Sequence, residues 1–170
     1  MKAFIALLRA VNVGGTGKLP MTELKAMCEA AGFRSVRTYI ASGNVVFLAS
    51  KTEAQVKATL EKAVAAHTGR PADVLVRNSA EMAAVLAGNP FPQMPNNRTL
   101  VIFLDEPPPA DCLLAVSGKV NEQVRLGTRE IYVYYADGAG ESKLKIPAAK
   151  NGTARNMNTV AKLAEMAASL

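Results

Sequence analysis

The apolar positions in the first half of the chain predict alternating strands and helices. Residues 2–9 are almost uninterrupted apolar side chains, a pattern typical of a strand that is covered on both faces. Further along, apolar residues recur at helical spacing or in short β-branched runs bounded by turn residues. The predicted elements are strands at 2–9, 36–40, 45–48 and 73–77 and helices at 20–31 and 51–68. Their order is βαββαβ, the order of a ferredoxin-like subdomain.

Capping signals mark the starts of the helices. Pro20 suits the first turn of the first helix, because its missing N–H costs nothing there. Ser50 and Glu53 have the spacing of a capping box at the start of the second helix. Asn78 and Glu81 have the same spacing at the start of a third helix, which runs to about residue 88.

The second half follows a similar order less regularly. An extended, proline-containing segment at 89–95 leads into it. Its predicted elements are a strand at 99–104, a short helix with Leu113, Leu114 and Val116, hairpin strands at 123–126 and 131–135, a polar loop at 137–152, and a last helix capped by Thr153 with Met157, Val160, Leu163 and Ala167 on its buried face. We find similar topology in the two halves and no matching residues.

These elements predict an α+β fold. We expect two ferredoxin-like subdomains of βαββα type, whose antiparallel sheets are covered by helices. The N-terminal subdomain is predicted at 1–77 and the C-terminal one at 99–170. A linking helix and a Pro-rich connection at 78–98 join them.

Two stretches of the chain carry long motifs, which comprise residues 7–15, Lys18, 21–24, Gly32, Phe33 and 36–47 in the first half and the closing segment 153–160. In these residues the chain resembles the domain-of-unknown-function family 1697. Ala10 stands where the family pattern leads us to expect glycine, and Met157 stands where we expect tryptophan. The resemblance implies paired ferredoxin-like subdomains in mostly bacterial proteins, with no established biochemical activity.

The distribution of charge points to a class of partner. The chain of 170 residues has a net charge of +6. Residues 143–155 hold four basic side chains and no acidic one, whereas the charged side chains of 105–118 are all acidic. Because a basic surface raises the local concentration of anions, we expect a small anionic ligand or a nucleic acid as partner.

The apolar residues also indicate a compartment. Cys28 and Cys112 lie far apart in apolar helical patterns, where a free cysteine packs as a small hydrophobic residue, and this usage suits a reducing compartment. No apolar stretch approaches the ~20 residues that span a bilayer. The apolar run that ends at Arg9 is not followed by a small-residue cleavage site. We therefore expect a cytoplasmic protein without a membrane partner.

The strongest local feature is the glycine-rich loop at 9–18. Its glycines allow backbone N–H groups to converge, and a helix start follows directly, so the loop can hold a phosphate or a carboxylate. Asn12 and Leu19 break the P-loop spacing, and Pro20 replaces the third glycine of the dinucleotide fingerprint. The anion-binding residues predicted here are Arg9, Asn12, Gly14, Gly15 and Lys18. The alternative is a tight strand-to-helix turn that needs glycine for its geometry.

Two further groups are candidates for anion binding. Arg37 lies on a predicted strand, just before the hairpin turn at 42–44. We expect that turn and the glycine-rich loop at opposite ends of the sheet, so we do not join them into one site. In the last helix, a cap at Thr153 would make the first turn display the polar residues that suit an oxyanion. They are Arg155, Asn156 and Asn158, although asparagines at a helix start are also ordinary caps.

The sequence lacks the residue patterns of a zinc site, of nucleophilic catalysis and of acid–base catalysis. His67 is the only histidine and suits the last turn of a helix, so we expect neither a zinc site nor a Ser-His-Asp or Cys-His arrangement. No paired carboxylates stand in a motif suited to acid–base work, and we expect no cofactor. Tyr132 and Tyr134 share one face of a predicted strand, where they either stack on bases or cover the sheet.

Three functions remain open. The first is a binding module for a phosphate-bearing ligand, a nucleotide or a nucleic acid. The second is an enzyme that acts without a metal on a small anionic or phosphorylated substrate held by Arg9, Lys18, Arg37 and Arg155. The third is a structural or assembly protein, such as a homodimer. We rank the binding module first because the chain carries no catalytic motif, and the sequence does not decide whether the protein is an enzyme.

Overall fold

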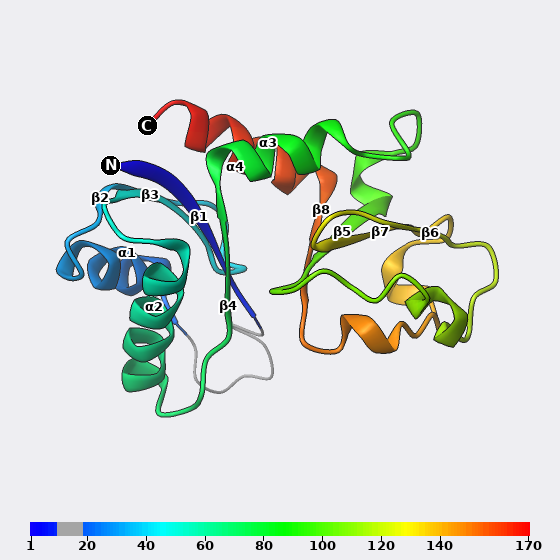
Figure 1. Ribbon diagram of the computed structural model, residues 1–170, viewed down its shortest axis with the longest axis horizontal. Helices are drawn as coiled ribbons and strands as arrows, with labels where there is room; N and C mark the ends of the chain where they lie inside the picture. Colours follow the sequence, from blue (N-terminus) through cyan, green and yellow to red (C-terminus); the bar gives the residue numbers. More distant parts are fainter. Residues whose placement is uncertain (10–18) are drawn as a thin grey trace. The chain divides into compact units, whose positions relative to one another are not determined.

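The computed structural model in Figure 1 describes residues 1–9 and 19–170. The described chain divides into two compact units. Unit 1 comprises Met1–Ala83 together with Leu163–Leu170, and unit 2 comprises Ala84–Lys162. The predicted C-terminal subdomain held the whole of the last helix, whereas the end of this helix groups with unit 1. Four of the predicted anion-binding residues, Asn12, Gly14, Gly15 and Lys18, lie outside the described residues.

Unit 1 contains a four-stranded antiparallel sheet with the strand order β2-β3-β1-β4. Its elements are β1 (Lys2–Leu8), α1 (Met21–Ala30), β2 (Arg34–Thr38), β3 (Asn44–Ala49), α2 (Glu53–Thr68) and β4 (Val74–Asn78), followed by the start of α3 (Ser79–Ala87). The βαββαβ order is the one that the apolar pattern predicted.

Helix α2 begins two residues later than predicted. The Thr52 hydroxyl accepts a hydrogen bond from the Gln55 N–H at 3.2 Å, and the Gln55 side chain accepts one from the Thr52 N–H at 2.9 Å. Thr52 and Gln55 therefore form the capping box, and the prediction of Ser50 and Glu53 is wrong. Both pairs have the same spacing and suitable side chains, so the local pattern could not separate them. The helix ends as predicted at Gly69, whose φ of 74° is left-handed.

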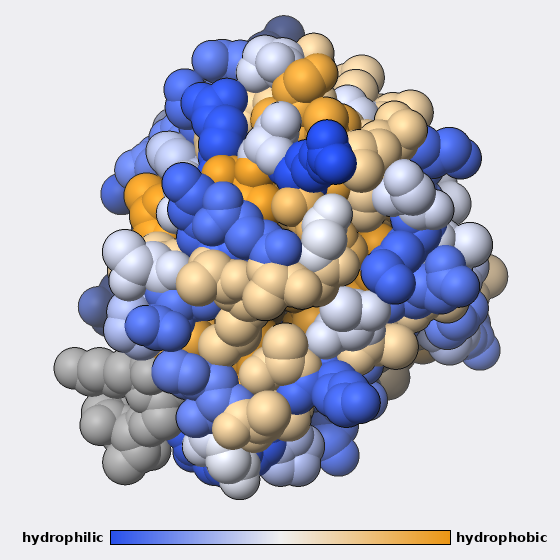
Figure 2. Space-filling model, turned by 90° about the vertical axis from the view of Figure 1, so that its left-hand side faces the viewer, coloured by the Kyte–Doolittle hydropathy of each residue, from blue (hydrophilic) through white to orange (hydrophobic). Residues whose placement is uncertain are grey.

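The core of unit 1 lies between the sheet and the helices α1 and α2, which cover one face of it (Figure 1). The rings of Phe33 and Phe47 are stacked there with centroids 4.4 Å apart. Residues 4–8 of β1 are all buried, which confirms the prediction of a strand covered on both faces. The face of the molecule in Figure 2 shows hydrophilic residues interspersed with apolar ones, as is usual for a protein surface.

Unit 2 contains a second four-stranded antiparallel sheet, with the order β6-β7-β5-β8. Its elements are η1 (Asn96–Arg98), β5 (Thr99–Phe103), η2 (Cys112–Ala115), β6 (Gln123–Leu126), β7 (Glu130–Tyr134), η3 (Ala139–Glu141), η4 (Pro147–Ala149), β8 (Thr153–Asn156) and the first half of α4 (Met157–Ala168), where η denotes a 3₁₀ helix. The short helix predicted around Leu113 is the 3₁₀ turn η2. Because only 3₁₀ turns lie between β5 and β6 and between β7 and β8, the ferredoxin-like description of this unit stays a prediction.

Strand β8 was not predicted from the sequence. Thr153 does not cap the last helix but pairs with Phe103 of β5, and Arg155 pairs with Val101. The cap of α4 is Asn156, whose side-chain oxygen accepts a hydrogen bond from the Thr159 N–H at 2.9 Å. The helix therefore begins at Met157.

The two units share a detail that sequence comparison of the halves missed. Arg77 in β4 and Arg155 in β8 are both buried, and the Nη1 of each donates to the carbonyl of the preceding residue at 2.9 Å. Each arginine is followed by an asparagine that caps the next helix: Asn78 accepts from the Glu81 N–H at 2.8 Å, as Asn156 accepts from Thr159. Together with the equal strand order, these Arg-Asn pairs mark the units as imperfect repeats, which corrects the expectation of no matching residues.

Both cysteines are buried, as predicted. Burial, with a smaller effect of the Glu29 charge, raises the pKa of the Cys28 thiol to about 12. The thiol thus stays protonated at neutral pH and packs as an apolar group. None of the helices in the described part of the chain is long and apolar enough to cross a membrane.

The Glu122 carboxylate gives unit 2 a pH-dependent contribution to stability. Hydrogen bonds from the Ser142 hydroxyl and then from the Val120 N–H lower its pKa from 4.5 to about 2. A depressed carboxylate pKa stabilises the folded state above the unfolded pKa, and this stabilisation disappears as the pH falls through the folded pKa. We expect the wild type to exceed Glu122→Gln in stability at pH 7, with a difference that shrinks between about pH 4.5 and pH 2. Urea titrations at several pH values measure this, and a pH-independent difference would contradict it.

Candidate functional site

The end of β1 in unit 1 brings two of the predicted polar segments together. The Leu8 N–H donates to the Gly43 carbonyl at 2.9 Å, and Leu7 pairs with Asn44. The hairpin turn between β2 and β3 therefore lies beside the start of the 9–18 loop. The expectation of opposite sheet ends is wrong, because β1 and β3 are antiparallel and the end of β1 lies next to the beginning of β3.

A buried asparagine fixes the shape of the hairpin turn. Asn44 has no exposed surface, and its side-chain NH₂ donates to the Tyr39 carbonyl at 3.0 Å and to the Ser42 hydroxyl at 2.8 Å. The Tyr39 N–H donates to the Asn44 carbonyl at 3.0 Å. These bonds hold the turn at the end of the sheet with Ser42 exposed to solvent.

The same turn holds a strained residue. Ile40 has a φ of 49°, in the left-handed region that β-branched side chains rarely adopt. Its side chain is exposed rather than packed in the core, so burial does not explain the strain. Such strain persists where the surrounding structure imposes it, and it gathers at ligand-binding segments.

Arg9 lies at the same sheet end, on the side of β4. Its N–H donates to the Asp73 carbonyl at 3.0 Å, and its Nη1 lies 3.4 Å from the Asp73 carboxylate. The side chains of Arg9 and Asp73 are 36% and 59% exposed. An ion pair in contact with solvent contributes about 0–1 kcal/mol, so an incoming anion can compete for this guanidinium.

The structure leaves Arg37 away from Arg9. Arg37 of β2 pairs with Val46 of β3, and Val46 pairs with Ile5 of β1. Arg37 is therefore level with Ile5, four residues before Arg9, and strand β3 lies between it and β1. Its Nη1 lies 3.5 Å from the Ser169 hydroxyl, at the limit of a hydrogen bond.

The three predicted residues near the last helix lie in unit 2. Arg155 is only 8% exposed, and its Nη1 donates to the Thr153 hydroxyl at 2.7 Å and to the Ala154 carbonyl. Loss of solvation lowers the pKa of the guanidinium to about 10, so it stays charged at neutral pH. Asn156 is occupied as a helix cap, and Asn158 is exposed. The first turn of α4 thus does not display Arg155, which corrects the predicted arrangement.

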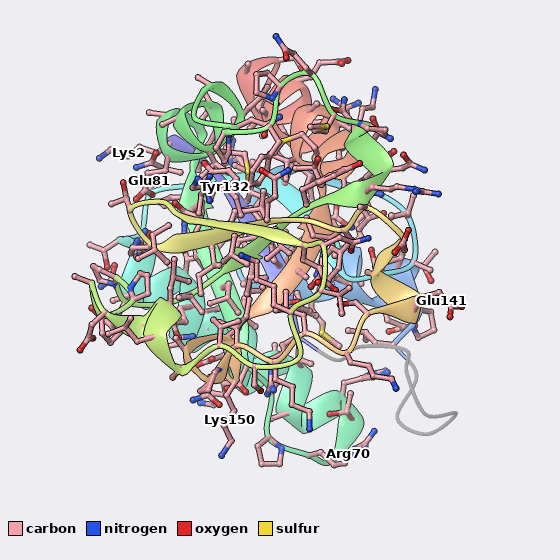
Figure 3. The ribbon with its side chains drawn as sticks, turned by 90° about the vertical axis from the view of Figure 1, so that its right-hand side faces the viewer. Lys2, Arg70, Glu81, Tyr132, Glu141 and Lys150 are labelled. Carbon is pink, nitrogen blue, oxygen red and sulfur yellow. The ribbon has the colours of Figure 1, made fainter. Side chains whose placement is uncertain are left out.

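The tyrosines of β7 cover the sheet. Tyr132 is buried, and its hydroxyl donates to the Val85 carbonyl of α3 at 2.8 Å (Figure 3). Burial, with a smaller effect of the Glu130 charge, raises the pKa of Tyr132 to about 12. Tyr134 packs at a tilt against Phe91, with ring centroids 6.2 Å apart. Of the two interpretations of this pair, the structure favours packing over base stacking.

Comparisons with known proteins give a family and a similar fold. Residues 1–132 match the model of a family described as "Protein of unknown function (DUF1697)". The structure is similar to that of the conserved bacterial protein SP0830 from Streptococcus pneumoniae, with a TM-score of 0.80 and 25% sequence identity over 98% of each chain. None of the curated proteins compared with the chain matches it. The structural similarity supports the mixed fold with two antiparallel sheets, and neither comparison assigns an activity.

Proposed function

The chain belongs to the DUF1697 family of proteins of unknown function, and we propose that it binds a small anionic ligand, such as a phosphate-bearing metabolite, at the end of β1 in unit 1. The observation that carries the proposal is the junction at Leu8 and Gly43. It joins the start of the Gly-rich basic loop to a polar hairpin turn, two segments that are far apart in the sequence.

The chemistry at this sheet end suits an anion. A guanidinium offers several N–H donors in a fixed fork that matches carboxylate and phosphate oxygens. Arg9 supplies such a group, and its ion pair with Asp73 is in contact with solvent. The Ser42 hydroxyl lies on the neighbouring turn, which Asn44 holds in one conformation. A turn ordered in advance loses less entropy on binding than a flexible one.

We expect Arg9→Ala to weaken anion binding about tenfold or more, because a hydrogen bond to a charged group contributes about 1.5–3 kcal/mol. The probes are inorganic phosphate, pyrophosphate, ATP and a single-stranded oligonucleotide, measured by calorimetry at low salt. Arg9→Lys should recover part of the affinity by restoring the charge without the fork.

Arg34→Ala is the matched control. Arg34 is also exposed, but it pairs with Leu48 at the other end of the sheet, beside Ala3. We expect its loss to change the affinity less than about twofold, because distant surface charges are screened by salt. Equal losses for Arg9→Ala and Arg34→Ala would reveal binding by general charge alone. Failure of all four probes to bind at low salt would remove the proposal.

A further inference from the structure

Unit 2 has a groove that is no part of the anion site proposed at the end of β1. The groove has a volume of about 690 Å³ and runs between the segment after β5 and the segment around η4. Its walls include the prolines at 107–109 on one side and Pro147 and Ala148 on the other, with Leu104 and Cys112 buried behind them. This volume lies within the range of roughly 300–1,000 Å³ typical of ligand pockets.

Every charged side chain that lines the groove is a carboxylate. Asp105, Glu106 and Asp111 line it, and all three are exposed. Asp111 directly precedes η2, but its side chain makes no capping hydrogen bond there. The Arg129 guanidinium donates to the Asp105 carbonyl at 3.1 Å, so in a chain with a net charge of +6 the negative potential of this groove rests on Glu106 and Asp111. Charge complementarity therefore selects a cationic occupant over an anionic one.

The groove also offers apolar contact. Leu114 lines it with 88% of its surface exposed, an unusual state for a leucine on a short structured turn. The prolines of the wall have fixed backbone angles, so they present this surface with little entropy left to lose on binding. An occupant that buries Leu114 gains from the removal of apolar surface from water.

We propose that the groove binds a basic segment of a partner polypeptide, in which a lysine or arginine stands beside apolar side chains. The two contributions are needed together. The positive net charge repels any cation at long range, so a cation without an apolar part gains little there. A peptide segment supplies the cation for the carboxylates and the apolar side chain for Leu114 and the proline wall.

The test uses a short labelled peptide that alternates arginine and leucine. The control peptide carries glutamate in place of every arginine. Fluorescence anisotropy measures the binding of each peptide to the whole protein. We expect the arginine peptide to bind and the glutamate peptide not to bind. In the double variant Glu106→Lys with Asp111→Lys, we expect at least a tenfold loss, because like charges then face each other. Leu114→Ser should weaken binding about tenfold.

Glu141→Lys is the control for charge reversal outside the groove, and it matches the net charge of the single variant Glu106→Lys. Glu141 is exposed and does not line the groove. In Figure 3 it lies at a different edge of unit 2 from Lys150, the neighbour of the groove residue Asn151. We expect an unchanged affinity for this variant. An equal loss in Glu141→Lys, or equal binding of the two peptides, would overturn the proposal.

A second copy of the chain is the competing occupant. Light scattering of the protein alone distinguishes it, since a partner segment predicts the same mass for the wild type and Leu114→Ser. A dimer that Leu114→Ser dissociates would overturn the proposal and assign the groove to contacts between copies. Because the groove lies in unit 2 and Arg9 in unit 1, Arg9→Ala should leave peptide binding unchanged, so the two proposals fail separately.

Discussion

Replacing Gly118 with alanine is expected to lower the free energy of unfolding by about 3 kcal/mol. Gly118 has a φ of 71°, and a Cβ atom built on it would lie 2.1 Å from the carbonyl oxygen of Lys143. That neighbour is backbone, so it cannot turn aside as a flexible side chain would. The substitution forces the segments around Gly118 and Lys143 apart.

The separation breaks a connection in unit 2. Ser117 and Lys145 form an isolated antiparallel bridge, with N–H to carbonyl distances of 3.0 and 2.8 Å. Ser117 follows η2 and Lys145 precedes η4 in the chain. These two 3₁₀ turns contact each other and line the groove of unit 2. We therefore expect Gly118→Ala to weaken binding of the arginine peptide as well as to destabilise the fold.

Gly69→Ala isolates the effect of the close approach. Gly69 also has a left-handed φ, of 74°, but no atom lies within 4 Å of a Cβ built on it. It should lose only the conformational strain, roughly 1–2 kcal/mol. Urea titration followed by circular dichroism measures both variants. If they lose the same stability, the contact of Gly118 with Lys143 is not tight.

The features that sequence predicted well depend on interactions close in the chain. The continuous apolar run of β1 and the Asn78 and Glu81 capping box each follow from a local rule, and the structure confirms both. The capping box of α2 shows the limit of such rules, because two overlapping pairs met the same rule and only the fold selected Thr52 and Gln55.

The features that sequence missed depend on distant partners. Strand β8 has no apolar alternation, and its polar residues suggested a helix start. It becomes a strand because β5 offers it an unpaired edge, and Arg155 is then buried opposite Val101. The position of the hairpin turn beside Leu8 follows from the antiparallel pairing of β1 with β3, two strands that are far apart in the sequence. The candidate site at the end of β1 therefore emerges only from the pairing of β1 with β3.

Replacing Asn44 with alanine is the second large effect that we expect, a loss of about 3 kcal/mol of stability. The side chain of Asn44 is buried, and alanine removes the donors that serve the Tyr39 carbonyl and the Ser42 hydroxyl. The part-buried Tyr39 carbonyl loses its donor, which costs about 1–3 kcal/mol, and the cavity left by the buried carboxamide adds to this. The hairpin turn should loosen, so we also expect weaker anion binding at temperatures where the variant is folded.

Asn44→Asp distinguishes hydrogen bonding from shape. Aspartate fills the same volume but carries no NH₂ group, and its carboxylate oxygen would face the Tyr39 carbonyl. If the hydrogen bonds stabilise the turn, Asn44→Asp should be at least as unstable as Asn44→Ala. Asn121→Ala serves as the control, because the side chain of Asn121 is exposed and donates to the exposed carboxylate of Asp137. We expect it to change stability by less than about 0.5 kcal/mol. A fully stable Asn44→Asp protein would mean that packing alone holds the turn, and the support for an ordered anion site at the end of β1 would be lost.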